Sequence, residues 1–396
     1  MAARGKSHPK SKHSIPRVAV LVDTSSSWGR RIVKGIHNYI RKSGRWQLFI
    51  EARGMEENWS VPPGWRGDGV IARIGNPEMA AELKNLRIPV VNVSGIQLQG
   101  ADFPRVSTDL NASAKLAADH FLNRGFKHFA FFSLSGLSYV AALQGAFVHT
   151  VKSAGAECAI HTEVPRNGAE MDWNADLAQL GEWLRSLPKP VGVLTWNQSS
   201  GREVIFACQV AGLLVPEEVA VLSASDDDLL CEVLHIPMSG IMVAAEQIGH
   251  EAARLLHRLM RGEKPPKDPT LFHSLSVVTR HSTDTLAMPD RALVKALSFI
   301  RANVSREIQV NEVAREAGVS RRVLERRFAE QLGRTPAEEI RRLHFERAKE
   351  LLAGTDLSIP DVAEAAGIGS PEYLAYLFRE NMKVTPLQYR KQIRSR

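Results

Sequence analysis

The stretch from Val310 to Arg390 contains one helical pattern written twice. The first copy reads VNEVAREAGVSRRVLERRF, then GRTPAEEIRR, and the second reads IPDVAEAAGIGSPEYLAYLF, then KVTPLQYRK. When Val313 is aligned with Val362, Gly318 falls on Gly367, and one extra residue in the second copy then places Phe328 on Phe378. Each copy combines a short alanine-rich helix, a glycine at a bend and a second helix with apolar residues four apart, which is typical of a helix-turn-helix. The repeat therefore predicts a duplicated, all-α unit.

The second helix of the first copy has a face that suits a phosphate-lined groove. Leu324 and Phe328 form its buried stripe, and Ser320 is a good N-cap. The remaining face is rich in arginine, so we expect it to contact DNA, and its glutamate can accept a hydrogen bond from cytosine. The expected contacts are Ser320, Arg321, Arg322, Glu325 and Arg326. The equivalent face of the second copy is less basic, so we expect it to contribute less sequence discrimination. Its expected DNA contacts are Ser370, Pro371, Glu372, Tyr373 and Ala375. A helical interaction module with the same symmetry is the alternative.

These C-terminal residues resemble the AraC/XylS family of transcription regulators. The tail GIGSPEYLAYLFRENMKVTPLQYR is similar to the family's most specific motif, which ends in Thr-Pro and Tyr-Arg. The resemblance covers residues 291–396 and implies seven helices in two subdomains, with the helices from Ser320 and Ser370 entering successive major grooves. This segment holds twenty Lys and Arg against fourteen Asp and Glu, an excess of the sign that DNA binding requires.

The preceding residues alternate between apolar runs of strand length and helical patterns. The runs are VAVLV from Val18, WQLFIEA from Trp46, GVIARI from Gly69, VVNVSG from Val90, FAFFS from Phe129, VGVLTW from Val191 and VAVLSA from Val219. Helical patterns include 113–123, 140–154, 200–211 and 245–260. Strands that are apolar throughout predict parallel sheets covered on both faces, and the length predicts two lobes. Ligands of such sheets bind beyond the carboxyl ends of the strands.

The middle of the chain resembles the sugar-sensing domain of LacI/GalR regulators, which has the periplasmic-binding-protein fold. The residues that carry this resemblance are VSTDLNASAKLAADHFLNRGFKHFAFF, CQVAGLLVPEEVAVLS and IGHEAARLLHRLMRG. A sensor of this type followed by an AraC-type domain resembles the xylose-operon-regulator branch of the AraC family. We expect a disordered basic tail at 1–16, the sensor at 17–282, a linker at 283–290 and the DNA-binding domain at 291–396.

A sugar site needs polar groups for hydroxyls and an aromatic face for the ring. By position after the strands, we expect ligand contacts from Asp23, Ser25, Trp28, Arg30, Arg73, Trp196, Asn197 and Asp226, with Asp227 as the alternative to Asp226. The sequence departs from the family at three points, where the resemblance implies Arg, Asp and Asp and this chain has Leu143, Trp196-Asn197 and Ser225. We therefore expect a pocket that does not bind xylose as the family does, and that takes a more apolar molecule or none.

The sequence thus predicts a sequence-specific, DNA-binding transcription regulator controlled by a sugar-like small molecule held between the lobes. The alternative is a ligand-independent regulator whose sensor serves only for dimerisation. Expected partners are promoter or operator duplex DNA, the effector, a second copy in a homodimer and, as a further candidate, RNA polymerase. The chain lacks an apolar run of membrane-spanning length and a signal peptide, so we expect a cytoplasmic protein.

An enzyme is the rival from another class. The sequence has no glycine-rich phosphate loop, no His-Glu-x-x-His and no Gly-x-Ser-x-Gly motif. Three cysteines, Cys158, Cys208 and Cys231, lack metal-like spacing and basic activating neighbours, which favours reduced thiols. We expect neither catalysis nor a metal or other cofactor.

Overall fold

The computed structural model describes residues 15–52, 60–61, 64–98, 100, 102–164, 172–285, 287 and 290–394. The chain separates into two compact units, the first ending at Asp284 and the second beginning at Thr285. Residues 1–14 of the predicted tail and 286, 288 and 289 of the predicted linker lie outside the described residues. Within the described part of the chain, no helix is long and apolar enough to cross a membrane.

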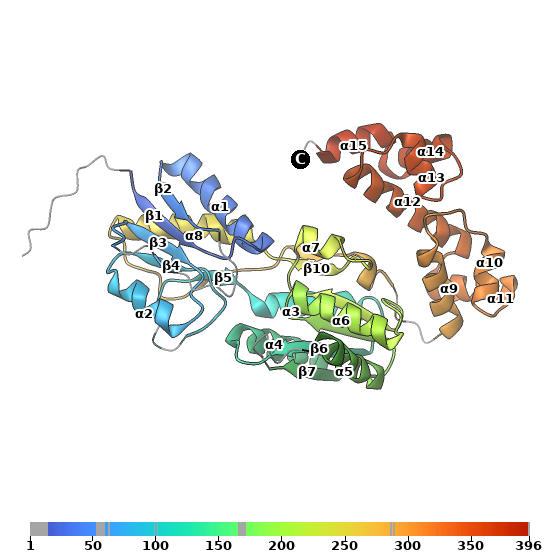
Figure 1. Cartoon of the computed structure of the whole chain (residues 1–396), viewed down its shortest axis with the longest axis horizontal. Coiled ribbons are helices and arrows are strands. Elements are labelled where there is room, and N and C mark those ends of the chain that lie inside the picture. The colour runs from blue at the N-terminus through green and yellow to red at the C-terminus, as the bar shows by residue number, and fades with distance from the viewer. Residues whose placement is uncertain are drawn as a thin grey trace, which may run out of the picture. The chain divides into compact units, whose positions relative to one another are not determined.

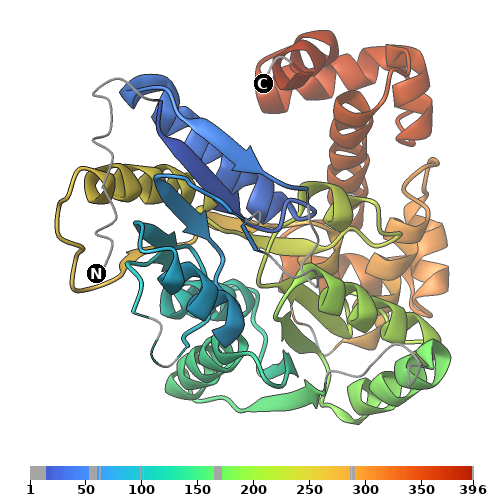
Figure 2. The same cartoon turned by 60° about the vertical axis from the view of Figure 1, so that its left-hand side comes forward.

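The first lobe of the sensor unit, lobe 1, is built on a parallel sheet in the order β2-β1-β3-β4. One face packs against α1 and α8, where Val18, Val20, Ile32 and Ile248 belong to one buried cluster, and the other face packs against α2. Helices α1 and α8 lie side by side (Figure 1; Figure 2). The elements are β1 (Arg17–Leu21), α1 (Ser27–Ser43), β2 (Gln47–Ile50), β3 (Gly69–Ala72), α2 (Pro77–Asn85), β4 (Val90–Asn92), β5 (Val106–Thr108), α8 (Ala245–Met260) and β11 (Thr270–Phe272).

Lobe 2 contains a six-stranded sheet in the order β12-β10-β9-β8-β6-β7, in which only β12 is antiparallel to its neighbour. Helices α5 and α6 cover one face, where Phe132 and Val193 are fully buried, and α3 and α4 contribute Phe121 and Phe147 to the other. The elements are α3 (Leu110–Leu122), β6 (His128–Leu134), α4 (Ser138–Ser153), β7 (Cys158–Glu163), α5 (Trp173–Ser186), β8 (Val191–Thr195), α6 (Gln198–Ala211), β9 (Val219–Ser223), α7 (Asp228–Glu232), β10 (Ser239–Met242), β12 (Ser276–Val278) and the 3-10 helix η2 (His281–Thr283).

The chain crosses between the lobes three times, after β5, after β10 and after β11. Adjacent crossovers are hydrogen-bonded to one another: Leu275 N donates to Met242 O at 2.8 Å, and the Ser113 and Ser274 hydroxyls lie 2.7 Å apart. Residues 273–275 therefore leave one sheet, after β11, and enter the other, before β12. This three-part hinge positions the carboxyl ends of both sheets opposite each other.

The seven apolar runs form β1, β2, β3, β4, β6, β8 and β9, as predicted. Strands β5 and β10 were missed because their sequences, VST and SGIM, are short and are not apolar throughout. Strand β7 was missed because it lies at the edge of its sheet and is only partly buried, so its sequence, CAIHTE, is not apolar throughout. A predicted boundary also differs: Thr283, assigned to the linker, is fully buried in lobe 2.

The second unit has seven helices among its described residues. Helices α9 (Arg291–Ala302), α10 (Val310–Glu316) and α11 (Arg321–Leu332) share one core, and α13 (Ile359–Ala365), α14 (Pro371–Met382) and α15 (Pro386–Arg394) share a second. Helix α12 (Pro336–Gly354) contributes Leu343 to the first core and Phe345 to the second, and it runs between the two groups in Figure 1. The two helix-turn-helix units are α10-α11 and α13-α14.

Candidate functional sites: an interlobe cavity and a helix-turn-helix surface

A cavity of about 190 Å³ lies where the carboxyl ends of the two sheets face each other. Lobe 1 contributes side chains that follow β1, β3 and β4, and lobe 2 contributes side chains that follow β6, β8 and β9. The lining residues are Asp23, Ser26, Trp28, Arg73, Val93, Gly95, Ser107, Thr108, Leu110, Ser113, Tyr139, Leu143, Trp196, Asn197, Gln198, Ala224, Ser225 and Val243. This position is the one that doubly wound sheets favour for ligands.

Three aromatic side chains and one arginine dominate the cavity wall. The Arg73 guanidinium lies 5.8 Å from the centre of the Trp28 ring in lobe 1. In lobe 2, the Tyr139 and Trp196 rings pack edge to face, with centroids 6.2 Å apart. Burial raises the pKa of Tyr139, while Arg73 opposes this shift through its charge and a hydrogen bond to the Tyr139 side chain. Arg73 therefore joins the aromatic groups of the two lobes across the cleft.

Two of the predicted ligand residues, Ser25 and Arg30, instead shape the loop after β1. Asp23 lines the cavity, but its carboxylate accepts hydrogen bonds from Ser25 N at 2.9 Å and Ser25 Oγ at 2.5 Å. Ser25 is exposed and does not line the cavity. Arg30 does not line it either, since its guanidinium donates to the carbonyl oxygens of Thr24 and Ser25. Both residues hold the loop that presents Asp23.

Asp226 is also used inside the protein and does not line the cavity. Its carboxylate lies 2.6 Å from the Arg280 guanidinium, and the two side chains are 2% and 10% exposed. The neighbouring Asp227 caps α7 and accepts a hydrogen bond from Ser27 N in lobe 1 at 2.9 Å. Burial acts to raise the pKa of Asp227, but hydrogen bonds from Leu230 and Ser27 and the charge of Arg30 lower it overall. These acids stabilise lobe 2 and its contact with α1.

All three positions at which the sequence departs from the family lie on the cavity wall. Leu143 and Trp196 present apolar surface there, and Asn197 and Ser225 present neutral polar groups. The Asn197 side chain caps α6 by accepting from Ser200 N at 2.8 Å, and the Ser225 hydroxyl donates to Gln198 Oε1 at 2.7 Å. The lobe 2 wall is consequently free of charged side chains among the lining residues.

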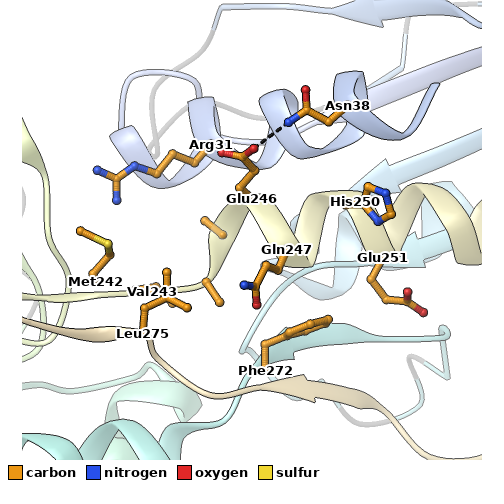
Figure 3. A pocket seen from close by; sticks show the side chains of 12 residues that line it. Arg31, Asn38, Met242, Val243, Glu246, Gln247, His250, Glu251, Phe272 and Leu275 are labelled. Atoms are coloured by element: carbon orange, nitrogen blue, oxygen red, sulfur yellow. Dashed lines mark hydrogen bonds between the residues drawn. The ribbon is translucent and has the colours of Figure 1, made fainter. Parts of the chain in front are cut away.

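A larger cavity, of about 620 Å³, lies outside the cleft, between α1, the start of α8 and the crossovers (Figure 3). Its polar groups are largely paired with each other or with neighbours: Asn38 Nδ2 donates to Glu246 Oε1 at 2.6 Å, and Glu251 binds Arg254. Its residues are Arg31, Asn38, Met242, Val243, Ala244, Ala245, Glu246, Gln247, His250, Glu251, Phe272 and Leu275. None of the predicted ligand residues is among them, so the cleft is the better candidate.

In the first helix-turn-helix, the core fixes which face of α11 is exposed. Leu324 and Phe328 are fully buried, and the Ser320 hydroxyl caps the helix by accepting from Val323 N. Arg321, Arg322 and Arg326 are exposed on the remaining surface, and Glu325 is partly buried. The Arg321 guanidinium lies 2.8 Å from the Glu325 carboxylate, a surface pair that is easily exchanged for a phosphate or a base.

In the second helix-turn-helix, Leu374, Leu377 and Phe378 bury the corresponding face of α14. Ser370 caps the helix by accepting from Tyr373 N, and Pro371 occupies its first turn. Glu372 and Tyr373 are exposed, whereas Ala375 is partly buried beside the core stripe. Tyr376, which we did not predict as a contact, is 54% exposed.

Comparisons with known proteins match these units in turn. Residues 17–111 match the XylR N-terminal domain, 118–283 the periplasmic binding protein-like domain, and 313–392 a helix-turn-helix domain. The xylose operon regulatory protein of Escherichia coli K12 is 29% identical over 94% of this chain and 96% of its own length, and that of Haemophilus influenzae Rd is 28% identical over 94% and 98%. The structure of the xylose-binding transcription activator XylR superposes with a TM-score of 0.80 at 28% identity, covering 96% of this chain and 98% of that one.

Over nearly its whole length, the chain is thus similar to XylR-type transcription regulators. The family resemblance and the fold class predicted from the sequence are thereby confirmed. The sensor alone also superposes on the transcription regulator CcpA of Lactococcus lactis, with a TM-score of 0.55 at 17% identity, which shows a shared fold.

Five of the eight predicted ligand residues of this XylR-type chain line the cleft: Asp23, Trp28, Arg73, Trp196 and Asn197. Among the lining residues that we missed, Tyr139 follows the predicted strand at Phe129, so the carboxyl-end rule could have identified it. Ser107, Thr108 and Val243 come from the hinge, for which the sequence carried no comparable signal.

The cysteines of this XylR-type regulator are poor nucleophiles. Burial raises the pKa of Cys158 and of Cys208 to about 12 and that of Cys231 to about 11. A thiol with so high a pKa stays protonated near neutral pH and does not attack a substrate readily. The relatives are regulators, which agrees with the prediction that this chain is not an enzyme.

Proposed function

We propose that this DNA-binding regulator is controlled by a sugar-like effector bound in the interlobe cavity. The observation that carries the proposal is the Arg73 side chain, which contacts Trp28 in lobe 1 and Tyr139 in lobe 2 across the cleft. A ligand that competes for Arg73, or adds to its contacts, binds the open and closed arrangements of the lobes with different affinity. Such a difference is what allows an effector to change the state of a sensor.

The lining residues favour an effector with one polar and one apolar side. Asp23 and Arg73 supply charged groups on lobe 1, whereas Leu143 and Trp196 supply apolar surface on lobe 2. The relatives' names point to xylose, but the charged groups that the family resemblance implies on the lobe 2 side are missing. We therefore expect a deoxy sugar, or another polyol with an apolar edge, to bind more tightly than xylose.

A regulator without an effector is the second candidate. Asn197, Ser225 and Gln198 are engaged in hydrogen bonds with protein groups. A cavity whose polar groups are already satisfied gives a sugar hydroxyl less to gain. In this case the sensor would serve only for dimerisation. Under either candidate we propose a cytoplasmic homodimer that binds operator DNA and contacts RNA polymerase.

The test is the thermal melting temperature of the full-length protein with D-xylose, L-arabinose, D-ribose, D-glucose, D-glucuronate, L-rhamnose and L-fucose. A compound present at 100 times its dissociation constant stabilises the folded state by about 2.7 kcal/mol, which should raise the melting temperature by about 5 °C or more. The largest shift should come from a deoxy sugar. The largest shift from xylose would contradict the expected preference.

Two variants assign the site. Trp196→Ala should abolish the shift because it removes an aromatic wall of the cleft, whereas Gln247→Ala, in the larger cavity, should leave it unchanged. The opposite pattern would place the effector in the larger cavity. No shift with any compound, together with retained binding to a selected DNA duplex, would favour the regulator without an effector. Size-exclusion chromatography with light scattering tests the dimer separately.

A further inference from the structure

The exposed surface of α14 is dominated by two aromatic side chains. The Tyr373 and Tyr376 rings are nearly parallel, with an interplanar angle of 13° and centroids 6.0 Å apart, and the side chains are 37% and 54% exposed. Large aromatic surfaces are usually buried, because each ring that stays in water forgoes a substantial hydrophobic gain. A stacked pair left on the exposed face of a helix-turn-helix therefore suggests a contact surface.

The internal repeat gives this pair a defined position. Phe378 occupies the place of Phe328 and Leu374 that of Leu324, and all four side chains are fully buried. Because the same two positions face the core, equivalent residues of α11 and α14 point in the same direction relative to the core of their own subdomain. Tyr376 then occupies on α14 the position that Arg326 occupies on α11. Arg326 is the residue for which we predict a base contact in the first motif.

The two equivalent positions carry side chains of opposite character, since Arg326 on α11 is charged and Tyr376 on α14 is an uncharged aromatic residue. No Lys or Arg occurs in the first two turns of α14, from Pro371 to Leu377. Two exposed carboxylates, Glu372 and Glu380, flank the tyrosines. The Tyr376 hydroxyl donates a hydrogen bond to Glu380, and this bond raises the pKa of Tyr376. A surface with two acids and two rings does not suit phosphate. It suits an uncharged, apolar group that lies among hydrogen-bonding groups.

The major groove of DNA offers one such group, the 5-methyl of thymine. We propose that Tyr373 and Tyr376 contact thymine methyl groups, so that the second motif recognises thymine through apolar contacts while the first recognises bases through arginine. The inference rests on the proposed function, since it requires that this chain binds a specific DNA duplex. It adds the base type and the group that the second motif recognises.

The experiment starts by selecting tight-binding duplexes from a randomised pool with the full-length protein. Each thymine of the selected duplex is then replaced by deoxyuridine, which removes only the methyl group, and the affinity is measured by fluorescence anisotropy. In one half of the site, one or two replacements should weaken binding by about fourfold each, the effect of one buried methyl group. In the Tyr376→Ala variant these same replacements should have no effect.

Matched variants separate the alternatives. Tyr376→Phe retains the ring and should retain the preference for thymine over uracil. Arg326→Ala should weaken binding by about tenfold or more while leaving that preference unchanged. Because Tyr376 is exposed, Tyr376→Ala should not lower the melting temperature, which excludes misfolding as the cause.

Three results would overturn the inference. Binding that is insensitive to every replacement would exclude methyl recognition, and an undiminished preference in Tyr376→Ala would assign the tyrosines to another partner, such as a protein. A pool that yields no enriched sequence would refute sequence-specific DNA binding itself, and the thymine contact with it. That last outcome is distinguishable because it appears before any thymine is replaced.

Discussion

Replacing Asp226 with alanine should destabilise the sensor, and any effect on effector affinity should follow from that loss. The Asp226 carboxylate and the Arg280 guanidinium lie 2.6 Å apart, and both side chains are almost fully buried. Removing one partner of a buried ion pair costs about 3 to 5 kcal/mol, because the other charge stays buried. Arg280 keeps a second, exposed partner in Glu232 at 3.5 Å and the carbonyl oxygen of Met238, so we expect the lower value.

The assay is the melting temperature of the full-length protein, which should fall by about 6 to 12 °C. The melting temperature of Asp226→Asn should fall less, since an amide oxygen can still accept a hydrogen bond from Arg280. The double variant Asp226→Leu with Arg280→Met should recover much of the loss, because it leaves no unpaired buried charge. Asp226→Ala with an unchanged melting temperature and abolished effector binding would refute the reasoning and make Asp226 a ligand contact.

Two further predictions concern a glycine and a histidine. Gly367→Ala should cost about 3 kcal/mol or more, because φ is +67° and a Cβ would lie 2.5 Å from the Arg306 carbonyl oxygen; its counterpart Gly318→Ala, at φ +68° with nothing within 4 Å, should cost only about 1 kcal/mol. Equal losses in chemical denaturation would contradict this. Burial, reinforced by the charge of Arg124, lowers the pKa of His120 to about 3, so below about pH 6.5 the unfolded chain binds a proton that the folded chain does not. The resulting contribution to stability is complete above pH 6.5 and is lost between pH 6.5 and 3. His120→Gln should therefore reduce the drop in melting temperature between pH 7.5 and pH 5. An identical drop in the variant would exclude His120 as the source of this pH dependence.

The sequence predicted elements best where burial is most complete. Strand β1 is covered on both faces, and its run of apolar residues could be recognised without any other information. The exposed faces of α11 and α14 followed from their buried stripes in the same way. Tyr376 was missed although the repeat aligns it with Arg326, because the prediction followed the charged residue type of the first copy and not the position.

The cleft could be predicted only in outline. The carboxyl-end rule identified the segments that surround it, but not which side chain of a segment faces the cavity. Asp226 illustrates the difficulty, since the partner that removes it from the cavity wall is Arg280, 54 residues later in the chain. The hinge residues Ser107, Thr108 and Val243 depend on three crossovers that come together only in the folded sensor.

The end of the sensor indicates how a change between the lobes could reach the linker. Thr283 is fully buried, and its hydroxyl lies 2.8 Å from His120 Nε2 and 2.7 Å from the Ser239 hydroxyl. The neighbouring Ser282 hydroxyl donates to Val221 O at 2.5 Å. All of these partners belong to lobe 2, on α3, β9 and β10, so the linker begins from lobe 2 alone. A rotation of lobe 2 against lobe 1 must therefore carry the start of the linker with it, whereas a movement confined to lobe 1 would leave it in place.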